Sequence, residues 1–264
     1  MEEIDRMSRS NALITGASSG IGLELARLAA ADGHNVVLVA RSTNRLNTLA
    51  HELRGTHNIE CIAFPLDLTK SNAPLQLIQA LDAQRITVDV LINNAGFGDR
   101  GSVVSLGLQR QLDMVQVNTM AVTALTRLIL PGMIKRKRGA ILNVASTAAF
   151  QAGPNMTVYY ATKAYVLHFS EGLCEELNGT GVTTTCLCPG PTVTGFAREA
   201  NIENSRLFRL WPMNAKEVAQ AGWTGLKNGK AIVIPGFKNR LTAFSTRLSP
   251  RSLARKIAYA LQAN

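Results

Sequence analysis

The stretch NALITGASSGIGLELARLAA, residues 11–30, decides the fold. Residues 11–15 are apolar and β-prone, residues 16–22 are rich in glycine, and apolar side chains then recur at helical spacing. A strand, a glycine-rich turn and a helix in this order place a pyrophosphate at the N-terminus of the helix. We therefore expect a nucleotide-binding turn at the start of this chain.

Three glycines suit this turn. Gly16 can make the tight turn, Gly20 can let the backbone approach a phosphate, and Gly22 can let the helix pack close to the sheet. The spacing G-x-x-x-G-x-G differs from the general dinucleotide fingerprint. The alternative is an ordinary strand–helix turn with spare glycines.

Beyond this stretch, strands and helices alternate along the chain. Expected strands cover residues 11–15, 35–40, 59–64, 88–92, 139–145, 182–187 and 231–234. Expected helices cover residues 20–32, 43–54, 72–84, 107–136, 156–178 and 215–228. This alternation predicts an α/β, doubly wound fold with a parallel sheet and helices on both faces. With 264 residues, 46% of them hydrophobic, one domain over residues 1–264 is expected.

Polar and glycine residues follow several of these strands. Asn93-Asn94-Ala95-Gly96 ends one strand, Ser146 ends the next, and Pro189-Gly190 ends a third. Ligands of open parallel sheets bind outside the carboxyl ends of the strands. These residues therefore mark the expected binding site.

Tyr159 and Lys163 stand one helical turn apart, so their side chains share one helix face. A lysine ammonium beside a phenol lowers the phenol pKa from its usual value near 10. Lowering it by about 3 units corresponds to roughly 4 kcal/mol of preference for the phenolate. Such a hydroxyl exchanges a proton near neutral pH, although this spacing also arises by chance.

The motifs taken together resemble the short-chain dehydrogenase/reductase family over roughly residues 10–235. They occur in the family's order: 15–22, Asp67, 93–96, Asn118, Ser146, Tyr159 with Lys163, and Pro189-Gly190. The resemblance implies a Rossmann-type, mostly seven-stranded sheet with strand order 3-2-1-4-5-6-7. It also implies a substrate lid at residues 195–214, and a homodimer or homotetramer joined through the helices that bear Asn118 and Tyr159.

The resemblance also assigns catalytic roles. A carbonyl oxygen would lie between Ser146 and Tyr159, hydride would come from a nicotinamide, and Tyr159 would supply the proton. Ser146 would stabilise the developing alkoxide. Lys163 would tune Tyr159 and contact the nicotinamide ribose, and the backbone of Asn118 would help to hold a water linked to that lysine.

Residues at the end of the second expected strand indicate which dinucleotide the protein binds. Ala40 replaces the acidic residue that binds the ribose hydroxyls in NAD-binding relatives, while Arg41 and Ser42 suit a 2′-phosphate. We therefore predict NADP(H); the alternative is that Arg41 is a solvated loop residue. The resemblance places the cofactor against Gly16, Ser18, Ser19, Gly20, Ile21, Gly22, Arg41, Ser42, Asp67, Leu68, Asn93, Ala95, Gly96, Tyr159, Lys163, Pro189, Gly190, Thr192 and Thr194. For Asp67, a turn or helix-cap role is the alternative.

The expected lid combines apolar and basic residues. Its apolar members are Phe196, Leu207, Phe208, Leu210 and Trp211, and its basic members are Arg198, Arg206 and Arg209. This combination suits a hydrophobic carbonyl compound with an acidic handle, such as an acyl thioester or a keto acid. A lid helix that packs its apolar side on the domain explains the same residues.

The formal net charge is +10, and residues 238–264 contribute basic but no acidic side chains. Apolar residues in this segment indicate an amphipathic, basic helical extension. We favour docking on the enzyme's own body over contact with an anionic membrane surface. Nucleic-acid binding is not expected, because no recognition motif accompanies the charge.

Other features of the sequence bear on metal binding and on the location of the protein in the cell. Four cysteines fit a reducing compartment, and Cys186 and Cys188 lack a second pair at zinc-ligand spacing, so no metal is expected. The acidic N-terminus lacks an apolar segment, which predicts a cytoplasmic protein. The favoured function is reduction of a carbonyl to an alcohol, or the reverse. A catalytically weak NADP(H)-binding regulator and a membrane-associated scaffold are the alternatives.

Overall fold

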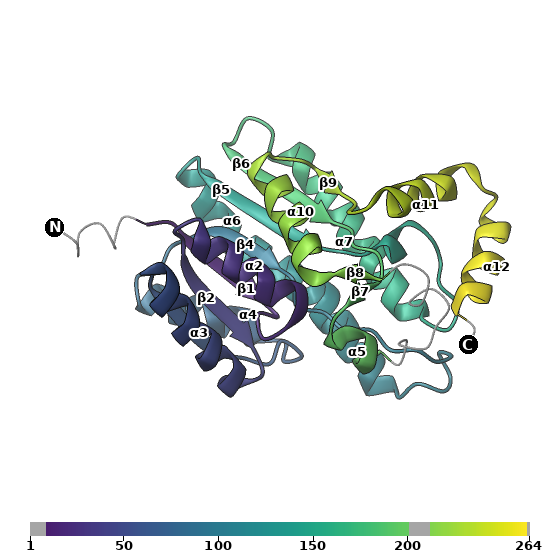
Figure 1. Ribbon diagram of the computed structural model, residues 1–264, viewed down its shortest axis with the longest axis horizontal. Coiled ribbons are helices and arrows are strands. Elements are labelled where there is room, and N and C mark those ends of the chain that lie inside the picture. Colours follow the sequence, from purple (N-terminus) through teal and green to yellow (C-terminus); the bar gives the residue numbers. More distant parts are fainter. Residues whose placement is uncertain (1–8, 201–211, 263–264) are drawn as a thin grey trace.

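The computed structural model describes residues 9–200 and 212–262, and its centre is a seven-stranded parallel sheet (Figure 1). The strand order is β3-β2-β1-β4-β5-β6-β9, which confirms the predicted order. The strands are β1 (Asn11–Thr15), β2 (Asn35–Ala40), β3 (Cys61–Pro65), β4 (Val88–Asn93), β5 (Gly139–Val144), β6 (Val182–Leu187) and β9 (Ile232–Val233). Every pairing is parallel, so all carboxyl ends meet at one edge.

Helices cover both faces of the sheet, as the alternation predicted (Figure 1). One face carries α2 (Gly20–Ala31), α3 (Thr43–His57) and α10 (Ala215–Lys227), and its core includes the buried Trp223. The opposite face carries α4 (Ala73–Ala83), α6 (Ala121–Lys135) and α7 (Thr157–Glu176). Two separate apolar cores therefore hold the sheet between two helical layers.

The expected helix over residues 107–136 has an irregular middle. It consists of α5 (Leu108–Val115), a π-helical segment η1 (Gln116–Met120) and α6. Among the described residues, only this combined helix is long and apolar enough to cross a membrane, and half of that apolar stretch is buried inside the protein. Because it packs against α4, β4 and β5, it is a core helix of the domain.

The segment after β6 contains short elements that the sequence pattern did not predict. β7 (Thr192–Val193) pairs with β8 (Met213–Asn214) in a second, two-stranded sheet, and α8 (Gly195–Glu199) follows β7. Strands of two residues are too short to leave a periodic pattern. Most of the expected lid, including Leu207, Phe208 and Trp211, lies outside the described residues.

The basic extension is helical, as expected, and consists of two helices, α11 (Phe237–Leu248) and α12 (Arg251–Gln262). Pro250 separates them, because proline disfavours helical geometry in the residue before it. In Figure 1 both helices reach away from the sheet beyond its last strand.

Candidate active site

A cavity of about 600 Å³ lies at the carboxyl edge of the sheet. Its size falls within the roughly 300–1,000 Å³ range of small-molecule sites. Most of the residues expected to contact a cofactor line it: Gly16, Ser18, Ser19, Gly20, Ile21, Arg41, Ser42, Asp67, Leu68, Ala95, Gly96, Tyr159, Lys163, Pro189, Gly190, Thr192 and Thr194. Ser146 lines the same cavity. The fold thus brings together residues from the ends of six strands, β1 to β6.

The glycine-rich turn has the backbone geometry that its sequence predicted. Gly16 and Gly20 have φ angles of +67° and +58°, which glycine adopts far more readily than other residues. Ser19, the N-cap of α2, makes no side-chain cap hydrogen bond, and the first turn of α2 holds no acidic residue. The positive end of this helix is therefore available to a phosphate in the cavity.

Asn94, to which the sequence assigned no role, fastens this turn to the end of β4. Its Nδ2 donates to the carbonyl oxygens of Thr15 and Gly16 at 2.9 and 3.2 Å. The Thr15 hydroxyl accepts from the backbone N–H groups of Asn94 and Ala95, both at 3.0 Å. These bonds fix the glycine-rich turn against the β4 loop, a contact that no local pattern in the sequence encodes.

Gly22 lies behind the cavity wall rather than on it. A Cβ atom at this position would lie 2.3 Å from Asn94 Nδ2 and 2.4 Å from the Gly16 carbonyl oxygen. The expectation that Gly22 allows close packing agrees with this geometry. Gly22 is not among the residues that line the cavity, so its expected direct contact with a cofactor stays a prediction.

Asn93, also expected to contact the cofactor, is not among the residues that line the cavity. Its side chain is buried and turns away from the cavity, and Nδ2 donates to Asn143 Oδ1 at 2.9 Å and Thr126 Oγ1 at 3.1 Å. Asn143 in turn donates to Ser170 Oγ at 2.9 Å. Because side chains alternate across a strand, Asn93 joins a polar network under the sheet while Asn94 serves the site.

The end of β2 supplies cations. Arg41, Ser42 and Arg45 line the cavity here, next to Ala40. The Arg41 side chain is 65% exposed, and its Nη2 lies 3.7 Å from Glu199 Oε1 of α8. Two guanidinium groups, a hydroxyl and the open end of α2 fit the phosphates of a dinucleotide.

Asp67 forms the turn that the sequence offered as one of its two roles, and it also faces the cavity. Its Oδ1 accepts from the backbone N–H of Thr69 at 3.0 Å, which forms an Asx turn after β3. Asp67 and Leu68 also line the cavity. The turn therefore holds Asp67 at the cavity wall.

Ser146, Tyr159 and Lys163 meet at the other end of the cavity. Ser146 follows β5, and its Oγ accepts from the backbone N–H of Ala148 at 3.1 Å as the cap of the 3₁₀ helix η2 (Thr147–Phe150). Tyr159 and Lys163 lie in the first two turns of α7. Lys163 Nζ donates to the Val144 carbonyl oxygen at 2.8 Å, which anchors the ammonium beside β5.

Burial dominates the electrostatics of this pair. It raises the pKa of the Tyr159 phenol, and a hydrogen bond from Ser146 partly opposes the shift. Burial also lowers the pKa of Lys163 to about 8. The predicted lowering of the Tyr159 pKa is therefore wrong for the protein alone: Lys163 Nζ lies 5.9 Å from the ring centroid, and desolvation disfavours both charged forms.

Asn118 lies behind the cavity in the π-helical segment and does not line it. Its Oδ1 accepts from the backbone N–H of Phe97 at 3.1 Å, and its Nδ2 donates to the Phe97 carbonyl oxygen at 2.9 Å. A Cβ atom on Gly96 would lie 3.0 Å from Asn118 Oδ1 and 3.3 Å from Lys163 Nζ. Asn118 thus fixes the loop after β4 next to the lysine.

The wall near Tyr159 is apolar. Phe97, Met156, Tyr160 and Phe196 line it, and the rings of Tyr159 and Phe196 lie 5.3 Å apart. Phe196 was expected as part of the lid. Phe97 and Met156 escaped prediction, because they lie in loops whose approach to the site depends on the tertiary fold.

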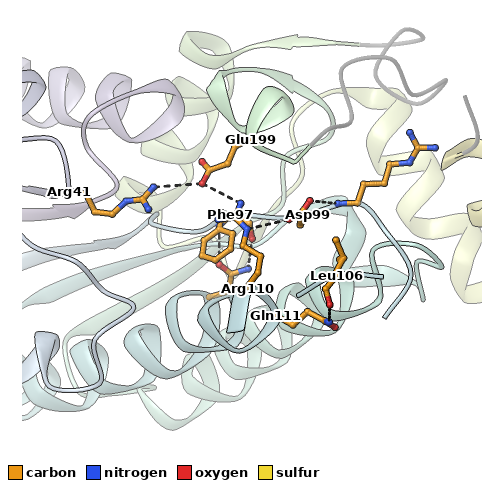
Figure 2. A network of polar contacts seen from close by, with 9 residues as sticks. Arg41, Phe97, Asp99, Leu106, Arg110, Gln111 and Glu199 are labelled. Carbon is orange, nitrogen blue, oxygen red and sulfur yellow. Dashed lines mark hydrogen bonds and ion pairs between the residues drawn. The ribbon is translucent and has the colours of Figure 1, made fainter. Parts of the chain in front are cut away.

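Charged residues fasten α8 across this wall (Figure 2). Arg110 of α5 lies over the Phe97 ring at 4.2 Å, and its guanidinium contacts Asp99 at 3.3 Å and Glu199 at 3.5 Å. Glu199 also contacts Arg41. One carboxylate therefore links the phosphate end of the cavity to the apolar end.

The chain is similar to characterised and solved proteins over most of its length. The family model described as short chain dehydrogenase matches residues 10–205. The ketoacyl reductase HetN of Nostoc sp. is 34% identical over 239 residues, which are 89% of this chain and 81% of that protein.

Solved structures agree with these matches. A short-chain dehydrogenase from Sphingobium yanoikuyae in complex with NADPH is 33% identical, has a TM-score of 0.79, and aligns over 90% of this chain and 93% of its own. A short chain dehydrogenase/reductase from Burkholderia phymatum in complex with NAD is 25% identical, with a TM-score of 0.80 and the same coverage. Neighbours with either dinucleotide thus support NAD(P)(H) as the cofactor class.

Proposed function

Because the chain belongs to the short-chain dehydrogenase family, whose members are oxidoreductases acting on small molecules, we propose that it reduces a carbonyl to an alcohol, or the reverse, with NADP(H). One observation carries the proposal. Ser146, Tyr159 and Lys163 line the same cavity as the glycine-rich turn and Arg41. A proton donor and a dinucleotide site therefore share one enclosed space.

The residues of the β2 end support the phosphorylated cofactor. Ala40 offers no carboxylate for ribose hydroxyls, while Arg41, Arg45 and Ser42 present donors to a 2′-phosphate. The N-terminal end of α2 and the backbone of residues 16–21 would hold the pyrophosphate. When bound, the nicotinamide supplies or accepts the hydride.

The chain's own residues handle the oxygen and its proton. Tyr159 Oη donates a proton to the carbonyl oxygen as negative charge develops there, and Ser146 Oγ donates a hydrogen bond to the same oxygen. Lys163, held by Val144, places its positive charge on the Tyr159 side of the cavity. That charge stabilises the phenolate left after proton transfer.

A hydrophobic ketone or an acyl-type carbonyl compound is the proposed substrate. The aromatic and methionine wall beside Tyr159 supports an apolar substrate. The similarity to a protein named ketoacyl reductase supports the acyl type. We further propose a cytoplasmic homodimer or homotetramer joined through the long helices that bear Asn118 and Tyr159. A regulator would need only the nucleotide half of the site, so the catalytic group at the other end favours an enzyme.

Tyr159→Phe tests the proposed chemistry. The variant loses the proton donor but keeps the buried ring, so we expect NADPH binding to be unchanged and kcat for ketone or 3-oxoacyl thioester reduction to fall about 10²–10⁴-fold. The measurement is NADPH oxidation across a carbonyl panel, with fluorescence titration of NADPH as the binding control. Near-normal turnover in the variant would reject the mechanism.

A further inference from the structure

Helices α11 and α12 form an arm, residues 237–262, that follows β9 and extends away from the sheet (Figure 1). At its root, Asn239 Nδ2 donates to the Pro235 carbonyl oxygen at 2.8 Å, and a Cβ atom on Gly190 would lie 2.5 Å from the Asn239 amide. Ala243 is buried, so one side of α11 packs on the body. These contacts anchor one side of α11 to the body of the protein and leave the opposite side of the helix uncovered.

That other side of α11 is apolar. Phe237, Leu241, Phe244 and Leu248 follow at spacings of four, three and four residues, which places them on one helix face. Their exposed fractions are 78%, 59%, 57% and 75%. The sequence favoured docking of this extension on the enzyme's own body, but these four side chains do not take part in such docking.

Helix α12 continues the same character. Leu253 and Ile257, four residues apart on one helix face, are each 49% exposed, while Ala258 is buried. A row of large apolar side chains over two successive helices exceeds the scattered exposure that is normal for a protein surface. Such a surface indicates a binding partner.

The charges around this surface identify the kind of partner. Exposed cations flank the apolar side chains, and residues 237–262 contain no aspartate or glutamate. The described exposed cations are Lys238, Arg240, Arg251, Arg255 and Lys256. A second copy of this chain would also carry a net charge of +10 and the same basic arm. Like charges oppose that contact, whereas an anionic surface complements it.

We propose that the arm binds an anionic lipid membrane surface. Phe237, Leu241, Phe244 and Leu248 insert into the boundary between head groups and acyl chains, and the flanking cations contact lipid phosphates. Helices of this kind lie in the plane of the interface, so the contact is peripheral and reversible. The proposal does not depend on the reaction catalysed.

Vesicle co-sedimentation of the full chain tests this proposal. We expect the protein to sediment with mixed phosphatidylglycerol/phosphatidylcholine vesicles, to remain in solution with phosphatidylcholine alone, and to be released by high salt. Arg255→Gln with Lys256→Gln should weaken binding about 25-fold, at about fivefold for each cation. Leu241→Ser with Phe244→Ser should abolish the sedimented fraction.

Matched variants elsewhere on the surface provide the controls. Lys135→Gln with Lys137→Gln removes two exposed cations, one at the end of α6 and one in the turn before β5, and Val104→Ser removes an apolar side chain that is 95% exposed. Both should bind vesicles like the wild type, and circular dichroism should show that every variant is folded. Failure to sediment with the phosphatidylglycerol-containing vesicles, or equal losses of binding in the control variants, would overturn the proposal. So would a smaller oligomer in the Leu241→Ser/Phe244→Ser variant combined with unchanged vesicle binding, because the apolar face would then join copies of this chain.

Discussion

Substituting Glu199 with glutamine should tighten the binding of NADPH. Glu199 holds the Arg41 guanidinium at 3.7 Å, and Arg41 is the group that we assign to the 2′-phosphate. The phosphate must compete with this carboxylate for the same guanidinium. Glutamine keeps the size of the side chain and removes the charge, so Arg41 no longer has an ionic competitor.

The geometry sets the size of the effect. The two side chains are 65% and 38% exposed, and exposed ion pairs of this kind contribute about 0.2–1 kcal/mol. Releasing Arg41 should therefore lower the Kd for NADPH by about 1.4- to 5-fold. NADH lacks the 2′-phosphate, so its Kd should stay unchanged. High salt should shrink the difference because both charges are accessible to ions.

Fluorescence titration of both dinucleotides with the wild type and Glu199→Gln measures these constants. Glu52→Gln is the matched control, because Glu52 pairs with Arg27 at 2.8 Å on an exposed surface outside the cavity. A weaker affinity for NADPH in Glu199→Gln would refute the reasoning and show that Glu199 positions Arg41 for the phosphate. Equal gains for NADH and NADPH would show that the effect does not involve the 2′-phosphate.

Three further perturbations test the fold beneath the site. Gly22→Ala should destabilise the protein by about 1–3 kcal/mol in urea denaturation, because the new Cβ would meet Asn94 and the Gly16 carbonyl oxygen. The control is Gly172→Ala in α7, which should not destabilise the protein because a Cβ there meets nothing within 4 Å. Asn118→Ala should cost about 1–3 kcal/mol by the same measurement, because it removes the buried partners of the Phe97 backbone, and equal stability would contradict that role. Burial lowers the pKa of Lys163 from 10.5 to about 8. Between pH 8 and pH 10.5 the lysine is therefore protonated in the unfolded chain and largely neutral in the folded protein, so its contribution to the free energy of unfolding rises with pH. The difference in unfolding free energy between wild type and Lys163→Met should therefore grow from pH 8 to pH 10, by at most about 1.4 kcal/mol per pH unit, and a flat difference would contradict it.

Much of the fold could be predicted from the sequence because its determinants are local. The run 11–30 contains its strand, turn and helix within twenty residues, and the alternation of elements specified a parallel sheet whose strand order the structure confirms. Most of the expected cofactor contacts line the cavity for a related reason. They follow strands, and parallel strands bring their carboxyl ends to one edge.

Two very short strands and the π-helical segment inside the long helix escaped prediction. β7 and β8 have two residues each and exist only because they pair with each other. A helix was expected over residues 107–136, and η1 interrupts its α-helical geometry where Asn118 bonds to the loop after β4. A π-helical turn of this kind depends on a tertiary contact rather than on the helix sequence.

The sequence by itself determined which residue types stand at the strand ends and in what order, since strand, turn and helix signals arise among near neighbours. Only the tertiary structure decided that Asn94 rather than Asn93 fastens the glycine-rich turn, a contact that joins residues 79 positions apart. It also decided that burial, rather than the neighbouring ammonium, controls the pKa of Tyr159. Desolvation and side-chain direction depend on everything packed around a residue, and those neighbours come from distant parts of the chain.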